Sequence, residues 1–182
     1  MAGVSDPAAV EPDTKDWTWV LERPCPQCGF DASLVARAGL GDRTRATLPA
    51  YRDALARADA AERPAPGVWS PLEYGCHVRD VFRRFDERLR LMLTEDDPAF
   101  ENWDQDATAL ADRYAEQDPA VVSAELLAAG EAIAGRFDAL RAAPDDVWQR
   151  PGRRSNGSRF TVESLGRYFL HDVVHHADDL RR

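Results

Sequence analysis

The chain has 182 residues, of which 23 are Lys or Arg and 32 are Asp or Glu, so its formal net charge is −9. This length suits one domain with a sizeable core, and 44% hydrophobic residues exclude wholesale disorder. The acidic balance excludes a nucleic-acid-binding surface, which needs a concentrated basic face. We see no apolar stretch that could span a bilayer and no secretory signal, so we expect no membrane partner. Three cysteines fit a reducing compartment, and we expect a cytoplasmic protein.

Residues 1–40 predict an irregular arm ahead of a helical domain at 41–182. The arm is interrupted by Pro7, Pro12, Pro24 and Pro26 and carries the apolar anchors Trp17, Trp19 and Phe30. It contains Cys25-Pro-Gln-Cys28-Gly, which is half of a zinc-knuckle pattern. A structural zinc site needs four ligands, and no second CxxC is present. The role of Cys25 and Cys28 therefore stays open between a metal site completed by other residues, a redox pair and an inert turn.

Four later stretches have the apolar spacing of amphipathic helices, and we place them at about 42–61, 70–94, 118–142 and 161–182. The second is the best marked, because Ser70 and Glu73 form a Ser-x-x-Glu capping box around a proline at the first helical position. Asp118 and Thr161 are the expected caps of the last two helices. No convincing run of strands is found. The sequence thus predicts an all-α protein with an antiparallel four-helix bundle.

Two connecting segments stand out by their charge. The acidic segment 95–117 contains scattered aromatic residues, and we expect it to shape the mouth of a pocket or a contact in a homodimer. The loop 151–158 is basic. Its Arg153 and Arg154, together with Arg159, are candidates for binding a carboxylate, although a solvated loop explains them more simply.

The last helix carries three of the four histidines, in two pairs spaced four residues apart. Asp172 and His176 fall in the middle of the apolar arc of this helix, whereas His171 and His175 fall to one side. A carboxylate and an imidazole that face the core need a partner, and a divalent metal would satisfy both.

His77 on the second helix is the remaining histidine and the natural third ligand. His77, Asp172 and His176 would form a 2-His-1-carboxylate set with open positions for water or substrate. The pair His171 and His175 would instead give a three-histidine site, and a polar network without metal is the other alternative. Asp80, one turn after His77, is a candidate acceptor for its ring N–H, and Asp179 for that of His175 or His176.

The segment Trp69-Ser-Pro-Leu-Glu-Tyr-Gly-Cys-His77, followed by a helix with Asp-x-x-x-His-x-x-Asp-Leu, resembles the DinB/YfiT-like superfamily over about residues 40–182. That superfamily includes mycothiol-dependent maleylpyruvate isomerases and bacillithiol and mycothiol S-transferases. The resemblance implies a four-helix bundle that binds Zn, Ni or Fe through one histidine of the second helix and a pair on the last. Aligning Asp179 and Leu180 with the family's ending places the pair at Asp172 and His176, where an Asp replaces the usual Glu or His.

The resemblance also implies a reaction. It predicts an S-transferase or isomerase that uses a low-molecular-weight thiol as cosubstrate and acts on a small-molecule substrate. A non-catalytic bundle that binds metal or uses the polar cluster for structure is the alternative of another class. An iron-dependent, oxygenase-like use of the same ligands is a further alternative.

Overall fold

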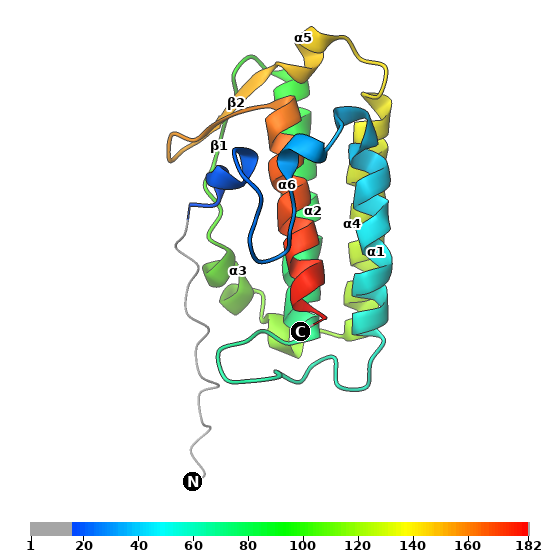
Figure 1. Ribbon diagram of the computed structural model, residues 1–182. Coiled ribbons are helices and arrows are strands. Elements are labelled where there is room, and N and C mark those ends of the chain that lie inside the picture. Colours follow the sequence, from blue (N-terminus) through cyan, green and yellow to red (C-terminus); the bar gives the residue numbers. More distant parts are fainter. Residues whose placement is uncertain (1–15, 182) are drawn as a thin grey trace.

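Four long helices form the body of the computed structural model, which describes residues 16–181. They are α1 (Leu40–Leu55), α2 (Pro71–Thr94), α4 (Pro119–Ala139) and α6 (Val162–Asp179) (Figure 1). The predicted four-helix bundle is confirmed. None of the helices in the described part of the chain is long and apolar enough to cross a membrane. Pro7 and Pro12, which we expected to interrupt the arm, lie outside the described residues.

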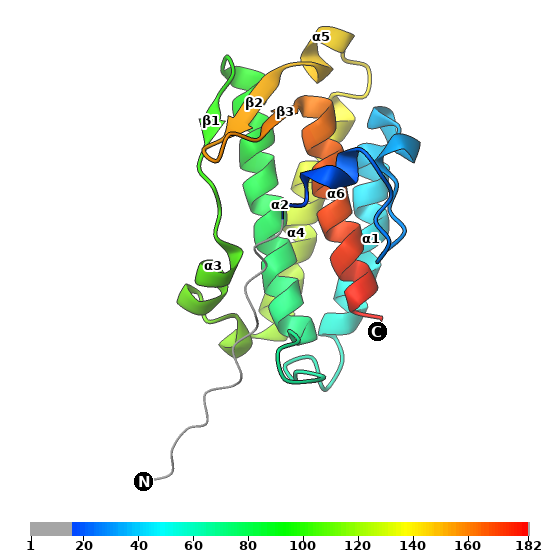
Figure 2. The same ribbon diagram turned by 60° about the vertical axis from the view of Figure 1, so that its left-hand side comes forward.

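The long connection between α2 and α4 sets the directions of the helices. Residues 95–118 return along the length of the bundle, so α2 and α4 run the same way, while α1 and α6 run the opposite way (Figure 2). Each of α1 and α6 is therefore antiparallel to α2 and to α4. Long crossovers of this kind are one of the known ways to connect a four-helix bundle. The crossover itself contains α3 (Gln105–Ala111) and a 3-10 turn at Tyr114–Glu116.

Side-chain caps start three of the long helices where the sequence predicts them. Ser70 accepts a hydrogen bond from the Glu73 N–H, and Glu73 accepts one from the Ser70 N–H, which completes the capping box of α2. Asp118 caps α4 and Thr161 caps α6. The carboxylate of Glu73 also binds Arg63, so this buried acid is fully explained by its structural role.

A small three-stranded sheet is the main departure from the all-helical expectation. β2 (Pro151–Arg154) and β3 (Arg159–Thr161) form a hairpin where the sequence indicated only a loop. β1 (Ala99–Phe100) pairs with β2 in parallel. Strands this short carry little periodicity of their own, and they form because the crossover and the loop before α6 lie side by side.

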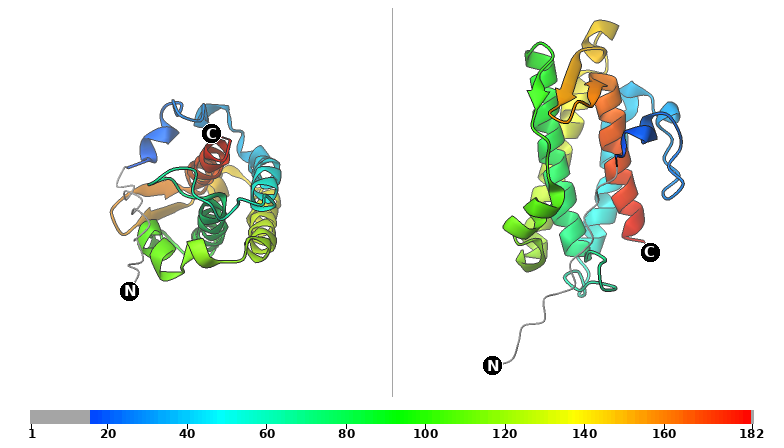
Figure 3. Two further views of the ribbon diagram at one scale, coloured as in Figure 1. Left: turned by 90° about the horizontal axis from the view of Figure 1, so that it is seen from below. Right: turned by 90° about the vertical axis from the view of Figure 1, so that its left-hand side faces the viewer.

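The N-terminal arm lies on the outer side of α6, as the view from below shows (Figure 3). It contains 3-10 turns at Thr18–Leu21, Ala32–Leu34 and Arg37–Gly39 and no longer helix between residues 16 and 39. A short helix, α5 (Asp145–Trp148), precedes β2. Between the long helices the core is aromatic at its centre, where Phe82, Phe85 and Phe137 surround Phe169.

Candidate metal centre

Three predicted ligands meet between α2 and α6. His77 Nε2 lies 3.5 Å from Asp172 Oδ1, and His176 Nε2 lies 3.5 Å from the same oxygen. The rings of His77 and His176 stand edge to face with their centroids 4.8 Å apart. Because Asp172 and His176 are one helical turn apart, α6 presents both to α2 at the level of His77. The structure therefore brings together the 2-His-1-carboxylate set that helical phase selected.

The polar atoms of this cluster are buried and poorly satisfied by protein groups. Both ring nitrogens of His77 and Oδ1 of Asp172 have no hydrogen-bond partner among the described residues. Burial lowers the pKa of His77, so its ring is neutral at pH 7. Burial also acts to raise the pKa of Asp172, but the histidines around it, His77 first, bring that pKa down to about 2. A carboxylate that faces two imidazoles, with the His77 ring neutral, offers the oxygen and nitrogen donors that a divalent ion requires.

Aromatic side chains enclose His77 on both sides. Trp103 stacks on its ring at 5.4 Å between centroids, and Trp69 packs against it at the same centroid distance. Tyr74, one turn before, contacts the ring of His176 at 5.3 Å. His77 itself is 0% exposed, so these rings keep bulk water from this side of the cluster. Trp103 comes from the irregular crossover, where no periodic pattern marks it as a neighbour of the site.

Asp179 holds the ring of His176 in place. Its Oδ2 lies 3.1 Å from His176 Nδ1, which fits the prediction that it orients a histidine of α6. The corresponding prediction for Asp80 is wrong. Asp80 does not accept a hydrogen bond from His77, whose two ring nitrogens have no such partner among residues 16–181. The Asp80 carboxylate accepts instead from the Tyr114 hydroxyl at 2.6 Å and from Arg79 at 2.9 Å.

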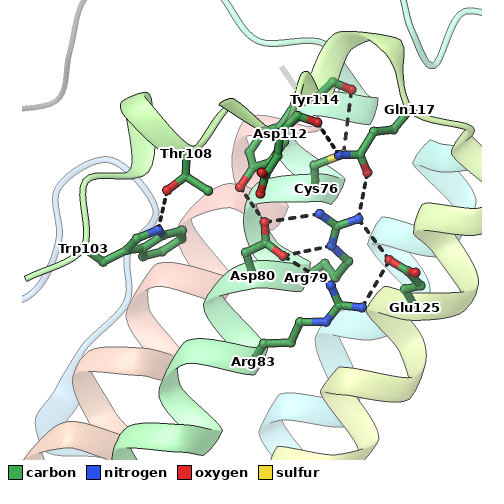
Figure 4. A network of polar contacts seen from close by, with 10 residues as sticks. All are labelled: Cys76, Arg79, Asp80, Arg83, Trp103, Thr108, Asp112, Tyr114, Gln117 and Glu125. Carbon is green, nitrogen blue, oxygen red and sulfur yellow. Dashed lines mark hydrogen bonds and ion pairs between the residues drawn. The ribbon is translucent and has the colours of Figure 1, made fainter. Parts of the chain in front are cut away.

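Asp80 and Arg79 instead tie the crossover to the bundle (Figure 4). The guanidinium of Arg79 donates hydrogen bonds to Gln117 at 2.8 Å and to Glu125 on α4 at 3.0 Å. Tyr114 is buried beside them. This network fixes the crossover just beyond α3, and so it helps to fix Trp103 against His77.

The alternative pair His171 and His175 points elsewhere. The two histidines face the N-terminal arm and lie beside its two cysteines. One ligand atom from each of the four side chains lies within 4.8 Å of the other three, in the group Cys25, Cys28, His171 and His175. His77 belongs to the other group. The two interleaved pairs of α6 thus lie in separate clusters.

A pocket opens on the solvent side of the Asp172 and His176 pair. Its lining comes from three parts of the chain: Trp17, Gln105, Tyr168, His171, Asp172, His175 and His176. A wider groove continues from it and shares Trp17, Gln105 and Tyr168. Gln105 belongs to the acidic crossover, so this segment contributes to the mouth of a pocket. This is one of the two roles that we expected for it. No sequence motif indicates that Trp17 and Tyr168 line this pocket.

Of the three candidate arginines, Arg154 lines the groove. Arg153 and Arg159 each form an ion pair with Asp97. Arg154 packs its guanidinium over the rings of Tyr168 and Phe160 and forms no ion pair within residues 16–181. Two of its guanidinium nitrogens, Nε and one Nη, are buried without a hydrogen-bond acceptor. Asp16 lines the same groove and Arg154 contributes to lowering its pKa, but the two side chains form no direct ion pair.

Comparisons with known proteins agree with this architecture. Residues 40–180 match the DinB superfamily. Among solved structures, YfiT from Bacillus subtilis, described as a probable metal-dependent hydrolase with an unusual four-helix bundle topology, superposes with a TM-score of 0.65. It is 23% identical, and the match covers 80% of this chain and 86% of YfiT. No curated protein matches the chain. The chain belongs to the DinB superfamily.

Proposed function

We propose that the chain is an enzyme in which His77, Asp172 and His176 hold a divalent metal ion, Zn, Ni or Fe. In this proposal it catalyses S-transfer or isomerisation with a low-molecular-weight thiol. The carrying observation is that the buried, unpaired ligand atoms of His77 and Asp172 converge with His176 beside a pocket. A divalent ion held by these three residues would stabilise a thiolate at neutral pH and so supply a nucleophile. The description of YfiT as a probable metal-dependent hydrolase also supports a metal-dependent role.

The surrounding residues have defined tasks in this proposal. Asp179 accepts the Nδ1–H of His176, which leaves the Nε2 lone pair directed at the site, next to Asp172. The stacked Trp103 and the neighbouring Trp69 exclude water behind His77, so the side toward Trp17, Gln105 and Tyr168 is open to substrate. The ligand set comes from two helices, which hold it more rigidly than loops would.

Turnover measurements test this function. Metal-loaded wild-type protein should transfer glutathione or a mycothiol analogue to at least one member of a panel of epoxides, activated alkenes and haloaromatic compounds. His176→Ala should lose at least about 100-fold of that rate, because a ligand matters more than the groups that orient it, which are typically worth 10- to 100-fold. Wild-type rates equal to the uncatalysed rates for every pair would refute the thiol-dependent activity. Metal-dependent ester hydrolysis without added thiol would favour a hydrolase instead.

The two guanidinium nitrogens of Arg154 that lack an acceptor lead to a prediction about substrate choice. A carboxylate on the thiol or the electrophile would satisfy this cation in the groove, which is continuous with the pocket at Trp17 and Tyr168. Arg154→Met should raise KM for carboxylated substrates by about 10- to 100-fold, the value of one charge-assisted hydrogen bond, and leave metal content unchanged. The matched control is Arg159→Met, which removes an arginine that pairs with Asp97 outside this groove. An equal change in KM for both variants, or for uncharged substrates, would contradict the assignment.

A further inference from the structure

A second cluster of metal-ligating side chains lies between the arm and α6. It consists of Cys25, Cys28, His171 and His175, whose ligand atoms all lie within 4.8 Å of one another. The Cys25 sulfur is 3.8 Å from His175 Nδ1, although the two residues are 150 positions apart in the chain. Both cysteines are free thiols. The half-complete zinc pattern of the sequence thus lies beside two further side chains that suit zinc, His171 and His175.

The turn that carries the cysteines is well defined. The Gly29 N–H donates a hydrogen bond to the Cys25 carbonyl at 2.8 Å, and the Cys25 N–H donates one to the Phe30 carbonyl at 2.8 Å. Gly29 has a φ of +72°, a left-handed conformation that glycine adopts without strain. Burial raises the pKa of the Cys28 thiol to about 11 in the metal-free chain, and the hydrogen bond from the Phe30 N–H to its sulfur acts against that rise. The backbone therefore directs both sulfurs toward α6 and already supplies one of the hydrogen bonds that a bound thiolate accepts.

One histidine of this cluster, His171, is held as a neutral ligand. His171 is 3% exposed, and its Nε2 is buried without a hydrogen-bond partner among residues 16–181. Burial lowers its pKa to about 4, so the ring is uncharged at pH 7. Trp17 packs against the rings of both His171 and His175, and Phe30 meets His171 edge on. An unpaired nitrogen inside an aromatic wall is costly unless an ion or another group binds it.

We propose that Cys25, Cys28, His171 and His175 form a structural zinc site that fastens the N-terminal arm to α6. A tetrahedral zinc ion with ordinary Zn–S and Zn–N bonds holds its ligand atoms about 3.3–3.8 Å apart, so the cluster needs to close by only about 1 Å. Two thiolates and two neutral imidazoles cancel the charge of Zn²⁺ and leave no open position, as structural sites require. This site is separate from the proposed catalytic centre and does not depend on it.

The two clusters are nevertheless adjacent. Asp179 Oδ2 lies 3.1 Å from His176 Nδ1 and 3.7 Å from His175 Nε2, so one carboxylate contacts a histidine of each cluster. The arm held by the zinc site also supplies Trp17 to the pocket beside Asp172. The zinc site would therefore fix one wall of the substrate pocket without touching the reaction itself.

Metal counting on the untagged full-length chain, purified under reducing conditions and reconstituted with Zn²⁺ or Co²⁺, tests this site. Wild type should bind two equivalents. Cys28→Ala and His175→Ala should each bind one, and so should His176→Ala, which removes a ligand of the other cluster. Co²⁺ gives intense charge-transfer absorption only with thiolate ligands, so that band should persist in His176→Ala and disappear in Cys28→Ala. Cys76→Ala is the matched control, because this cysteine contacts the Tyr114 carbonyl and lies in neither cluster.

Hydrogen exchange gives a second readout in the His176→Ala background, where only the arm site remains. Removal of Zn²⁺ should speed exchange of the amides of Cys25 and Gly29, which are hydrogen-bonded in the turn. A wild-type chain without the cobalt–thiolate band, or a folded Cys28→Ala protein that still binds two equivalents, would overturn the proposal. A Cys25–Cys28 disulfide that persists under reducing conditions would overturn it as well and would assign the pair to redox chemistry.

Discussion

Asp172→Asn should strongly weaken metal binding at the proposed catalytic centre while the bundle stays folded. The amide has nearly the same volume as the carboxylate, but it removes the negative charge that faces His77 and His176 at 3.5 Å. We expect the affinity of this centre for Zn²⁺ to fall by at least about 100-fold, since even the groups that only orient a ligand are worth 10- to 100-fold. Competition with a chromophoric chelator measures this change.

The matched control is His171→Ala, which lies next to Asp172 on α6 but belongs to the cluster with Cys25. His171→Ala should weaken metal binding only at the cluster with Cys25. The variant should therefore lose the cobalt–thiolate band and keep the metal bound at Asp172. If Asp172→Asn instead binds both metal ions with unchanged affinity, the Asp172 carboxylate is not a ligand.

Phe169→Ala should have the largest effect on stability. Phe169 is 0% exposed and packs against the rings of Phe82 and Phe85 on α2 and of Phe137 on α4, so it joins α6 to two other helices. Removing a buried phenyl ring costs about 3–5 kcal/mol, because the transfer free energy is lost and a cavity remains. For a chain of this length the melting temperature should fall by roughly 6–20 °C.

Thermal and denaturant unfolding of metal-free protein check that value, since bound metal would add its own stabilisation. Val121→Ala on α4 is the control, because this side chain is 55% exposed, and its free energy of unfolding should stay within about 0.5 kcal/mol of wild type. A similar loss for both variants would mean that Phe169 is not part of a tightly packed core.

Local signals in the sequence account for the helices and for the metal cluster at His77. Ser70 with Glu73, Asp118 and Thr161 mark helix starts through contacts within three residues, which a sequence displays directly. The period of α6 separated Asp172 and His176 from their neighbours, because helical phase is also a local property. These predictions needed no knowledge of how distant segments meet.

The small sheet and the cluster at Cys25 depend on contacts between segments that are distant in the sequence. β1 and β2 have too few residues to show alternation, and they pair only because the crossover passes the hairpin. Cys25 and Cys28 carry a recognisable pattern, but nothing in the sequence shows that the arm folds back onto His171 and His175. The sequence likewise does not predict that Trp103 stacks on His77, since contact between an irregular segment and a helix produces no periodic pattern.

The position of α6 in the chain has a consequence for synthesis in the cell. Both proposed metal sites take half or more of their ligands from this helix, while His77 and the two cysteines of the arm are translated much earlier. A nascent chain that has not yet reached α6 therefore exposes thiols and an imidazole with no folded site to receive them. Metal that binds before then can only be held loosely, so correct loading has to follow the docking of α6.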